Sequence, residues 1–209
     1  MLFDEPLGHL DAKLREELKF EIRRIQRESG ITAIYVTHDQ SEAFAIADYI
    51  YVMNRGVVEQ QGTPVELYEN PQSPFIAEFI GAINAIKGQV LEVDRGSGVA
   101  VISAEGIRIK AMVREDITRG DRVVVGVRPE HVRVDREPPK KSVDTNVFTG
   151  RVVRKVFLGP YLQLEIDIGY RDPIRTALFG EEKYRYMDIG IGDEVYVSFN
   201  KVFVFRSRS

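Results

Sequence analysis

The pattern of apolar residues changes near residue 81, and this change constrains the fold more than any other feature of the sequence. Before it, short apolar runs alternate with segments of helical period; after it, short strand-like segments separated by Gly, Asp and Pro follow one another. The first pattern is typical of a doubly wound α/β sheet and the second of an all-β structure. We therefore predict an α+β multidomain fold, with an α/β domain in residues 1–81 and an all-β domain in residues 82–209.

Helix and strand signals place several elements in the first domain. Asp11 can cap a helix that extends to Ser29, and Gly30 can end that helix in a left-handed conformation. One face of this helix is apolar, with a stripe formed by Leu14, Leu18, Ile22 and Ile25. The β-branched segment 31–38 predicts a buried strand. After it we expect helices and one strand–turn–strand unit, in segments 39–47, 49–62, 63–70 and 73–81.

The second domain consists of strand-like segments in which apolar and polar residues alternate, the mark of half-buried antiparallel strands. A polar, proline-rich stretch at residues 135–145 predicts a connector. It divides the domain into subregions of about 82–136 and 143–209, each of a size that suits a small five-stranded OB-like barrel.

Composition excludes several classes of protein and site. The chain has no cysteine, which excludes disulfides and thiolate metal sites and fits a reducing cytoplasm. No apolar run approaches the roughly 18 residues that a membrane-spanning helix needs, and residues 1–5 do not resemble a signal peptide. The formal net charge of −3 argues against a nucleic-acid partner.

Two short motifs carry side chains suited to phosphate chemistry. In "LFDEP" an apolar strand ends in Asp4 and Glu5, at the carboxyl edge of the predicted sheet where phosphate ligands bind. Asp4 could hold Mg²⁺ through water, and Glu5 could accept a proton from an attacking water. His38 follows a second strand and could hydrogen-bond a phosphate. Taken singly, the first motif is also compatible with an acidic terminus, and the second with a loop histidine that has no role.

Taken together, these motifs resemble a known family. The order "DEPLGHLDAKLR", a helix, and then "TAIYVTHDQSEAFAIADYIYVMNRGVVEQQGTPVELYENPQSPFIAEFIG" is similar to the ATP-binding subunits of ABC importers, without a gap from Leu2 to Gly81. The resemblance implies that Asp4 ends the Walker B strand and binds Mg²⁺, and that Glu5 is the catalytic base. It also implies that "LGHLD" is the D-loop, that His38 is the switch histidine, and that Asp4, Asp11 and His38 lie beside ATP.

The second domain has a resemblance of its own. "VGVRPEHVRV" at residues 125–134 resembles the signature strand of the transport-associated OB domain, TOBE, which follows the ATPase domain in such importers. This implies a homodimer of ATPase subunits bound to membrane permease subunits, on the cytoplasmic face of the membrane. An OB barrel can also bind oligonucleotides, but the basic groove with interleaved aromatic residues that this requires is not evident.

The chain also departs from the family. It contains no G-x-x-x-x-G-K-[ST] phosphate loop and no "LSGGQ"-like signature, and Gly8 replaces the usual D-loop serine. We therefore expect an N-terminal truncation before Walker B, and a regulatory and dimerisation fragment that neither binds ATP and Mg²⁺ tightly nor hydrolyses ATP alone. Two alternatives remain open: a half-subunit that a separate chain completes in trans, and a stand-alone OB-type sensor of a small ligand. The sequence does not identify the transported substrate.

Overall fold

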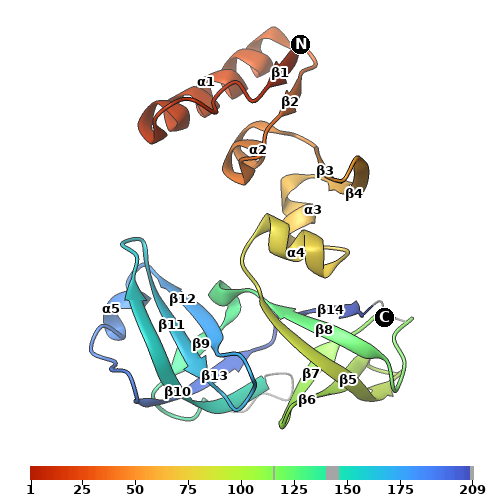
Figure 1. Cartoon of the computed structure of the whole chain (residues 1–209), viewed down its shortest axis with the longest axis vertical. Coiled ribbons are helices and arrows are strands. Elements are labelled where there is room, and N and C mark those ends of the chain that lie inside the picture. The colour runs from red at the N-terminus through yellow and green to blue at the C-terminus, as the bar shows by residue number, and fades with distance from the viewer. Residues whose placement is uncertain (115, 140–145, 208–209) are drawn as a thin grey trace. The chain divides into compact units, whose positions relative to one another are not determined.

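The computed structural model, which describes residues 1–114, 116–139 and 146–207, divides into two compact units (Figure 1). The first unit, Met1–Gln72, is mixed α/β, and the second, Ser73–Ser209, is rich in β-strands. The predicted fold class, an α/β part followed by an all-β part, is therefore confirmed. Each unit is described by itself below.

The first unit begins with two short parallel strands joined by a long helix. Its elements, in chain order, are β1 (Leu2–Asp4), α1 (Ala12–Ser29), β2 (Ile34–Val36), α2 (Gln40–Ile46), β3 (Ile50–Asn54), β4 (Val57–Gly62) and α3 (Pro64–Glu69). β1 pairs with β2 in parallel, and β3 and β4 form an antiparallel hairpin. The doubly wound sheet expected from the sequence is thus represented by one parallel pair of strands.

Helix α1 begins and ends where the sequence predicts. The Asp11 carboxylate accepts a hydrogen bond of 3.0 Å from the Leu14 amide, which satisfies one free amide of the first turn. Gly30 ends the helix with a φ of 66°, a left-handed conformation that glycine adopts without strain. A cap needs only residues that are close in sequence, so it can be recognised without knowledge of the tertiary fold.

The apolar stripe of α1 is not buried. Leu14 and Ile25 are exposed, whereas Lys19 on the neighbouring face is only 3% exposed. The helix packs on α2 through this polar seam, where Lys19 Nζ donates to Ser41 Oγ at 3.2 Å and Arg23 Nη1 donates to the Ile46 carbonyl at 2.5 Å. The contacts within the first unit therefore leave Leu14 and Ile25 exposed and bury the rest of the apolar stripe only in part.

The second unit contains one short helix followed by two five-stranded antiparallel sheets. Helix α4 (Pro74–Ile80) packs on the strands through Ala77, which lies in one apolar cluster with Ile83 and Phe205. The compact units therefore divide before α4 and not after it. The remaining elements are β5 (Asn84–Asp94), β6 (Val99–Ala104), β7 (Ile107–Met112), β8 (Arg122–Val127), η1 (Pro129–His131), β9 (Arg133–Asp135), β10 (Asn146–Phe157), β11 (Tyr161–Asp167), β12 (Ile174–Phe179), α5 (Glu182–Arg185), β13 (Glu194–Phe199) and β14 (Phe203–Arg206).

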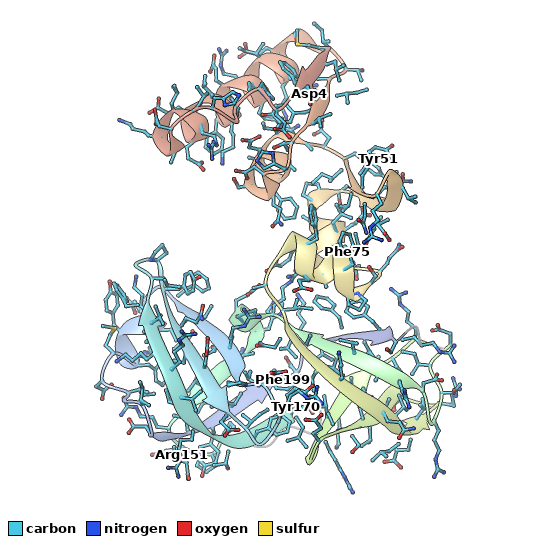
Figure 2. All side chains as sticks on the ribbon, in the orientation of Figure 1. Asp4, Tyr51, Phe75, Arg151, Tyr170 and Phe199 are labelled. Carbon is cyan, nitrogen blue, oxygen red and sulfur yellow. The ribbon has the colours of Figure 1, made fainter. Side chains whose placement is uncertain are left out.

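The two sheets exchange their last strands. One sheet has the order β14-β8-β5-β6-β7 and the other has the order β12-β11-β10-β13-β9. Strand β9 follows β8 in the chain but pairs with β13, and β14 follows β13 but pairs with β8. Residues from both sheets share one hydrophobic core, in which Tyr170 and Phe199 lie between the sheets (Figure 2). The subregions suggested by the sequence are thus joined into a single packed unit.

The two sheets are built on one repeated pattern. Asn84 and Asn146 begin the long strands β5 and β10, and Gly88 and Gly150 follow four residues later in each. Each long strand also has a register shift in its pairing with the following strand. A Cβ atom at Gly88 would lie 2.6 Å from the Ser103 carbonyl oxygen, so close approach of the backbones requires glycine there.

Most of the predicted connector at residues 135–145 lies outside the described residues. Among the residues that the structure does describe, no helix is both long enough and apolar enough to cross a membrane.

Candidate active site

The carboxyl ends of β1 and β2 bring together the acidic and imidazole side chains predicted from the sequence. Asp4 is the last residue of β1 and pairs with Val36, the last residue of β2 (Figure 2). The Glu5 amide donates to the Val36 carbonyl at 2.9 Å and extends this pairing by one residue. Because the strands are parallel neighbours, Glu5 and His38 both leave from the same edge of the sheet.

Glu5 and His38 contact each other directly. His38 Nδ1 lies 3.0 Å from Glu5 Oε1, and the two side chains are 76% and 52% exposed. Glu5 has a φ of 45°, a left-handed conformation that is uncommon for a residue with a Cβ atom and occurs often at functional sites. The hydrogen bond to the Glu5 carboxylate raises the pKa of His38, with smaller contributions from Glu42 and Asp39.

Below this exposed pair lies a buried carboxylate. Glu42 of α2 is 2% exposed, and its Oε2 accepts hydrogen bonds from the Thr37 hydroxyl at 2.7 Å and from the Tyr35 hydroxyl at 3.1 Å. Burial and the hydrogen bond to Glu42 raise the pKa of the Tyr35 hydroxyl. Tyr35 therefore stays protonated and donates to Glu42 across the neutral range.

Arg15 of α1 also lines the site. Its Nη2 donates to the Leu10 carbonyl at 2.9 Å, its Nη1 lies 3.8 Å from Asp39 Oδ2, and its Nε lies 3.9 Å from Glu42 Oε1. A cavity of about 30 Å³ remains between these groups, lined by Glu5, Gly8, Arg15, Thr37, His38, Asp39 and Glu42. This space suits a water molecule or two and is far too small for a nucleotide.

The structure brings together some of the predicted site residues and separates others. Glu5 and His38 are in contact and Asp4 lies at the same edge, but Asp11 caps α1 and does not line the cavity. Sequence reasoning missed Arg15 and the buried Glu42. The sequence gives little indication of their role, because charged residues on helices ordinarily face solvent.

Gly8 lines the cavity where the ABC family commonly has serine. A Cβ atom at this position would lie 3.5 Å from the Glu5 carbonyl oxygen, which is an ordinary van der Waals contact. Glycine is therefore not required by space at this position.

The donor set fits a magnesium ion that arrives with a nucleotide and not one held by the protein alone. Within the described part of the chain, no group of three or more His, Cys, Asp or Glu side chains is arranged to hold a metal. Mg²⁺ in nucleotide sites keeps several waters and uses one or two carboxylates together with phosphate oxygens. The exposed Asp4 carboxylate at the end of β1 can supply such a single ligand.

His38 is expected to titrate above the ordinary histidine value of 6.5, because the Glu5 carboxylate stabilises the imidazolium. The pair is then fully formed below 6.5 and is lost as the pH rises through the raised pKa of His38. An NMR titration of the imidazole resonances measures this, with the other two histidines as internal references. Glu5→Gln should return the pKa of His38 towards 6.5; an unchanged value would show that the hydrogen bond is absent in solution.

Comparison with known proteins finds a family match and several relatives. Residues 125–205 match the TOBE domain family model. The sulfate/thiosulfate import ATP-binding protein CysA of Bacillus cereus is 38% identical, over 98% of this chain and 54% of its own length. The spermidine/putrescine import ATP-binding protein PotA of Acidothermus cellulolyticus is 43% identical, over 78% of this chain and 42% of its own. PotA of Thermotoga maritima is 39% identical, over 81% of this chain and 46% of its own.

A solved structure resembles the β-rich part. The cytoplasmic molybdate-binding protein ModG, with molybdate bound, has a TM-score of 0.51 and 16% identity and covers 59% of this chain and 96% of its own. That likeness concerns the fold alone. The chain spans about half the length of the curated relatives it matches. It is therefore a homologue of the ATP-binding subunits of ABC importers, related to their C-terminal part and containing a TOBE domain.

Proposed function

We propose that this polypeptide is the C-terminal part of the ATP-hydrolysing subunit of an ABC importer, and that it carries one edge of the nucleotide site. The parallel pairing of β1 and β2 supports this most strongly, because it places Asp4, Glu5 and His38 at one sheet edge with Glu5 and His38 in contact. Homology to a sulfate/thiosulfate import protein over 98% of the chain and to a spermidine/putrescine import protein over 80% of it agrees with the proposal.

In the complete protein, each edge residue has a role that its chemistry allows. The Glu5 carboxylate would accept a proton from the water that attacks the γ-phosphate. His38 would donate a hydrogen bond to a phosphate oxygen when its imidazole is protonated, a state that the contact with Glu5 favours. Asp4 would hold Mg²⁺ through water, and a bound Mg²⁺ would supply positive charge to offset the charge of the phosphates.

The 209 residues lack the motifs that bind the phosphates of ATP in this family. No G-x-x-x-x-G-K-[ST] loop and no "LSGGQ"-like sequence occurs in them. The backbone amides and lysine of such a loop supply most of the contacts to the β- and γ-phosphates. By itself the polypeptide would act in regulation and dimerisation through its TOBE domain. Its partners would be a second ATPase subunit and permease subunits at the cytoplasmic face of the membrane.

The purified polypeptide is expected not to bind MgATP at micromolar concentrations, because Asp4 and His38 alone give too few contacts. Isothermal titration calorimetry with MgATP measures this directly. Micromolar affinity would refute the proposed division of the nucleotide site.

A second arrangement, completion in trans by a separate chain, is favoured by the open faces of the first unit. Leu2 and Ile34, which are paired residues in the parallel strands, are 71% and 63% exposed. Parallel sheets are ordinarily covered on both faces, so a partner that adds strands and helices would bury these side chains.

Co-expression with the N-terminal half of a relative such as CysA of Bacillus cereus tests completion in trans. We expect the pair to copurify and to hydrolyse MgATP. Glu5→Gln should then lower kcat by on the order of 10²–10⁴-fold, the usual contribution of a general base. Lys13→Gln, on the exposed first turn of α1, is the matched control and should leave the rate unchanged. Copurification without hydrolysis would argue against the role proposed for Glu5.

The stand-alone sensor remains the weakest of the three. The second unit has a groove of about 320 Å³, lined in part by Glu78, Asn84, Tyr170, Asp172 and Arg175. Its two carboxylates disfavour an oxyanion such as the molybdate bound by ModG. A thermal-shift screen with molybdate and sulfate should therefore show no stabilisation of this chain.

A further inference from the structure

We propose that Arg15 and Glu42 are positioning residues that hold Glu5 and His38 in contact, by tying the segments after β1 and β2 to α1 and α2. The proposal rests on the proposed function for the role of the pair, but not for its geometry. Neither residue belongs to the edge that would meet the nucleotide.

The contact between Glu5 and His38 needs other interactions to hold the two side chains in place. A contact between an exposed histidine and an exposed glutamate contributes little to stability and often nothing measurable, because solvent screens it and two side chains must be fixed. Glu5 in addition holds a left-handed backbone conformation. The contact at 3.0 Å therefore does not account for its own geometry, which the surrounding backbone has to impose.

Arg15 links three segments with one guanidinium. It donates to the Leu10 carbonyl in the turn that follows Glu5, and it faces Asp39, the residue that follows His38. It also faces Glu42 on α2 with its Nε, a buried atom that has no hydrogen bond of its own. Because the fork of the guanidinium is rigid, the positions of these three segments are coupled to one another.

Glu42 fixes the loop that carries His38. Its buried carboxylate can only accept hydrogen bonds, so the Thr37 hydroxyl must donate to it at 2.7 Å. The Thr37 oxygen then accepts from the Asp39 amide at 2.9 Å. This chain of hydrogen bonds fixes the residues on both sides of His38. A buried carboxylate left without Arg15 or these donors would be strongly unfavourable, so the loop would have to rearrange.

The decisive test is an NMR titration of His38 in the full 209-residue chain carrying Arg15→Met. The charged groups facing His38 are Glu5, Asp39 and Glu42, with Arg15 behind them. Electrostatics alone predicts that removal of a nearby positive charge raises the pKa of His38. Loss of positioning predicts the opposite, because His38 separates from Glu5. We expect a fall of the pKa to the value seen in Glu5→Gln.

Two further variants keep the outcome clear. Thr37→Val removes the hydroxyl with no change of charge and little change of shape, and it should lower the pKa of His38 in the same direction as Arg15→Met. Arg24→Met is the matched control, since Arg24 lies on the exposed side of the same helix and its ion pairs with described residues are to Glu21 and Glu28 of that helix. It should leave His38 unchanged.

A pKa of His38 that is unchanged or raised in both Arg15→Met and Thr37→Val would overturn the proposal. Circular dichroism of the variants checks that their helix content matches that of the wild-type chain. No nucleotide is present in this titration, so its result stands apart from that of MgATP binding or hydrolysis. A failure of the positioning proposal is thereby distinguished from a failure of the proposed function.

Discussion

Replacing Arg128 with alanine is expected to lower the free energy of unfolding of the second unit by about 3–5 kcal/mol, as for other large buried side chains whose polar contacts are lost. Arg128 is 1% exposed. Its Nη1 donates to the Ala77 and Ala82 carbonyls at 3.4 Å each, and its guanidinium lies 5.5 Å from the centre of the Phe203 ring. One side chain thus joins the end of α4, the end of β8 and the exchanged strand β14.

The chemistry of this site explains why a cation belongs there. The carbonyls at the end of a helix carry partial negative charge, and a guanidinium both neutralises it and donates to more than one of them. The aromatic face of Phe203 adds a cation–π contact in a place shielded from water. These contacts explain arginine at position 128 of "VGVRPEHVRV", because its side chain holds α4 against the strands of the second unit.

Urea unfolding followed by circular dichroism measures the effect. Arg122→Ala is the matched control, because Arg122 begins the same strand with an exposed side chain and should change stability by no more than about 0.5 kcal/mol. Arg128→Lys keeps the charge but loses the branched guanidinium. Its free energy of unfolding should lie between those of the wild type and Arg128→Ala. A loss below about 1 kcal/mol in Arg128→Ala would contradict the role assigned to the buried guanidinium.

Features that depend on neighbours in sequence could be predicted well. The cap at Asp11 and the stop at Gly30 of α1 are confirmed, as is the cap at Thr63, where Thr63 and Glu66 form a capping box that begins α3. The edge formed by Asp4, Glu5 and His38 was accessible for a related reason. Each lies just beyond a strand, and parallel strands end at the same side of a sheet.

Features that depend on distant partners could not be predicted. Alternation of apolar and polar residues shows that β9 and β14 are strands, but it contains nothing about which sheet each joins. Arg15 and Lys19 are spaced like a solvated helix face, yet they pack against α2. Polar burial of this kind depends on partners such as Ser41 and Glu42, which only the tertiary fold supplies.

Removal of the amide of Asn84 or Asn146 is expected to lower the stability of the second unit by about 2–4 kcal/mol each, since each replacement by alanine breaks several buried hydrogen bonds. Asn84 Nδ2 donates to the Val127 carbonyl of its own sheet at 3.2 Å. It also donates to the Arg175 carbonyl at 2.9 Å, and its Oδ1 accepts from the Arg175 amide at 2.8 Å. Asn84 therefore joins β5 to β12 of the other sheet.

Asn146 makes the corresponding contacts in the opposite direction. Its Nδ2 donates to the Phe199 carbonyl of its own sheet at 3.2 Å and to the Lys110 carbonyl of the other sheet at 2.9 Å. Its Oδ1 accepts from the Lys110 amide at 2.7 Å. Because the two asparagines occupy equivalent places in the repeated pattern, their alanine variants should lose similar amounts of stability. Asn54→Ala, at the half-buried end of β3 in the first unit, is the control and should leave the stability of the second unit unchanged.

The exchanged strands determine how these variants should unfold. Each sheet contains a strand from the other segment, and the two share one hydrophobic core. Neither sheet can lose its order without exposing apolar surface of the other, so the second unit should unfold in a single transition even when both asparagines are replaced. Urea unfolding followed by near-ultraviolet circular dichroism and by hydrogen exchange on β6 and β11 should give coincident midpoints, shifted together. Separate midpoints for β6 and β11 would show that the two sheets are independent, and that the asparagines do not join them.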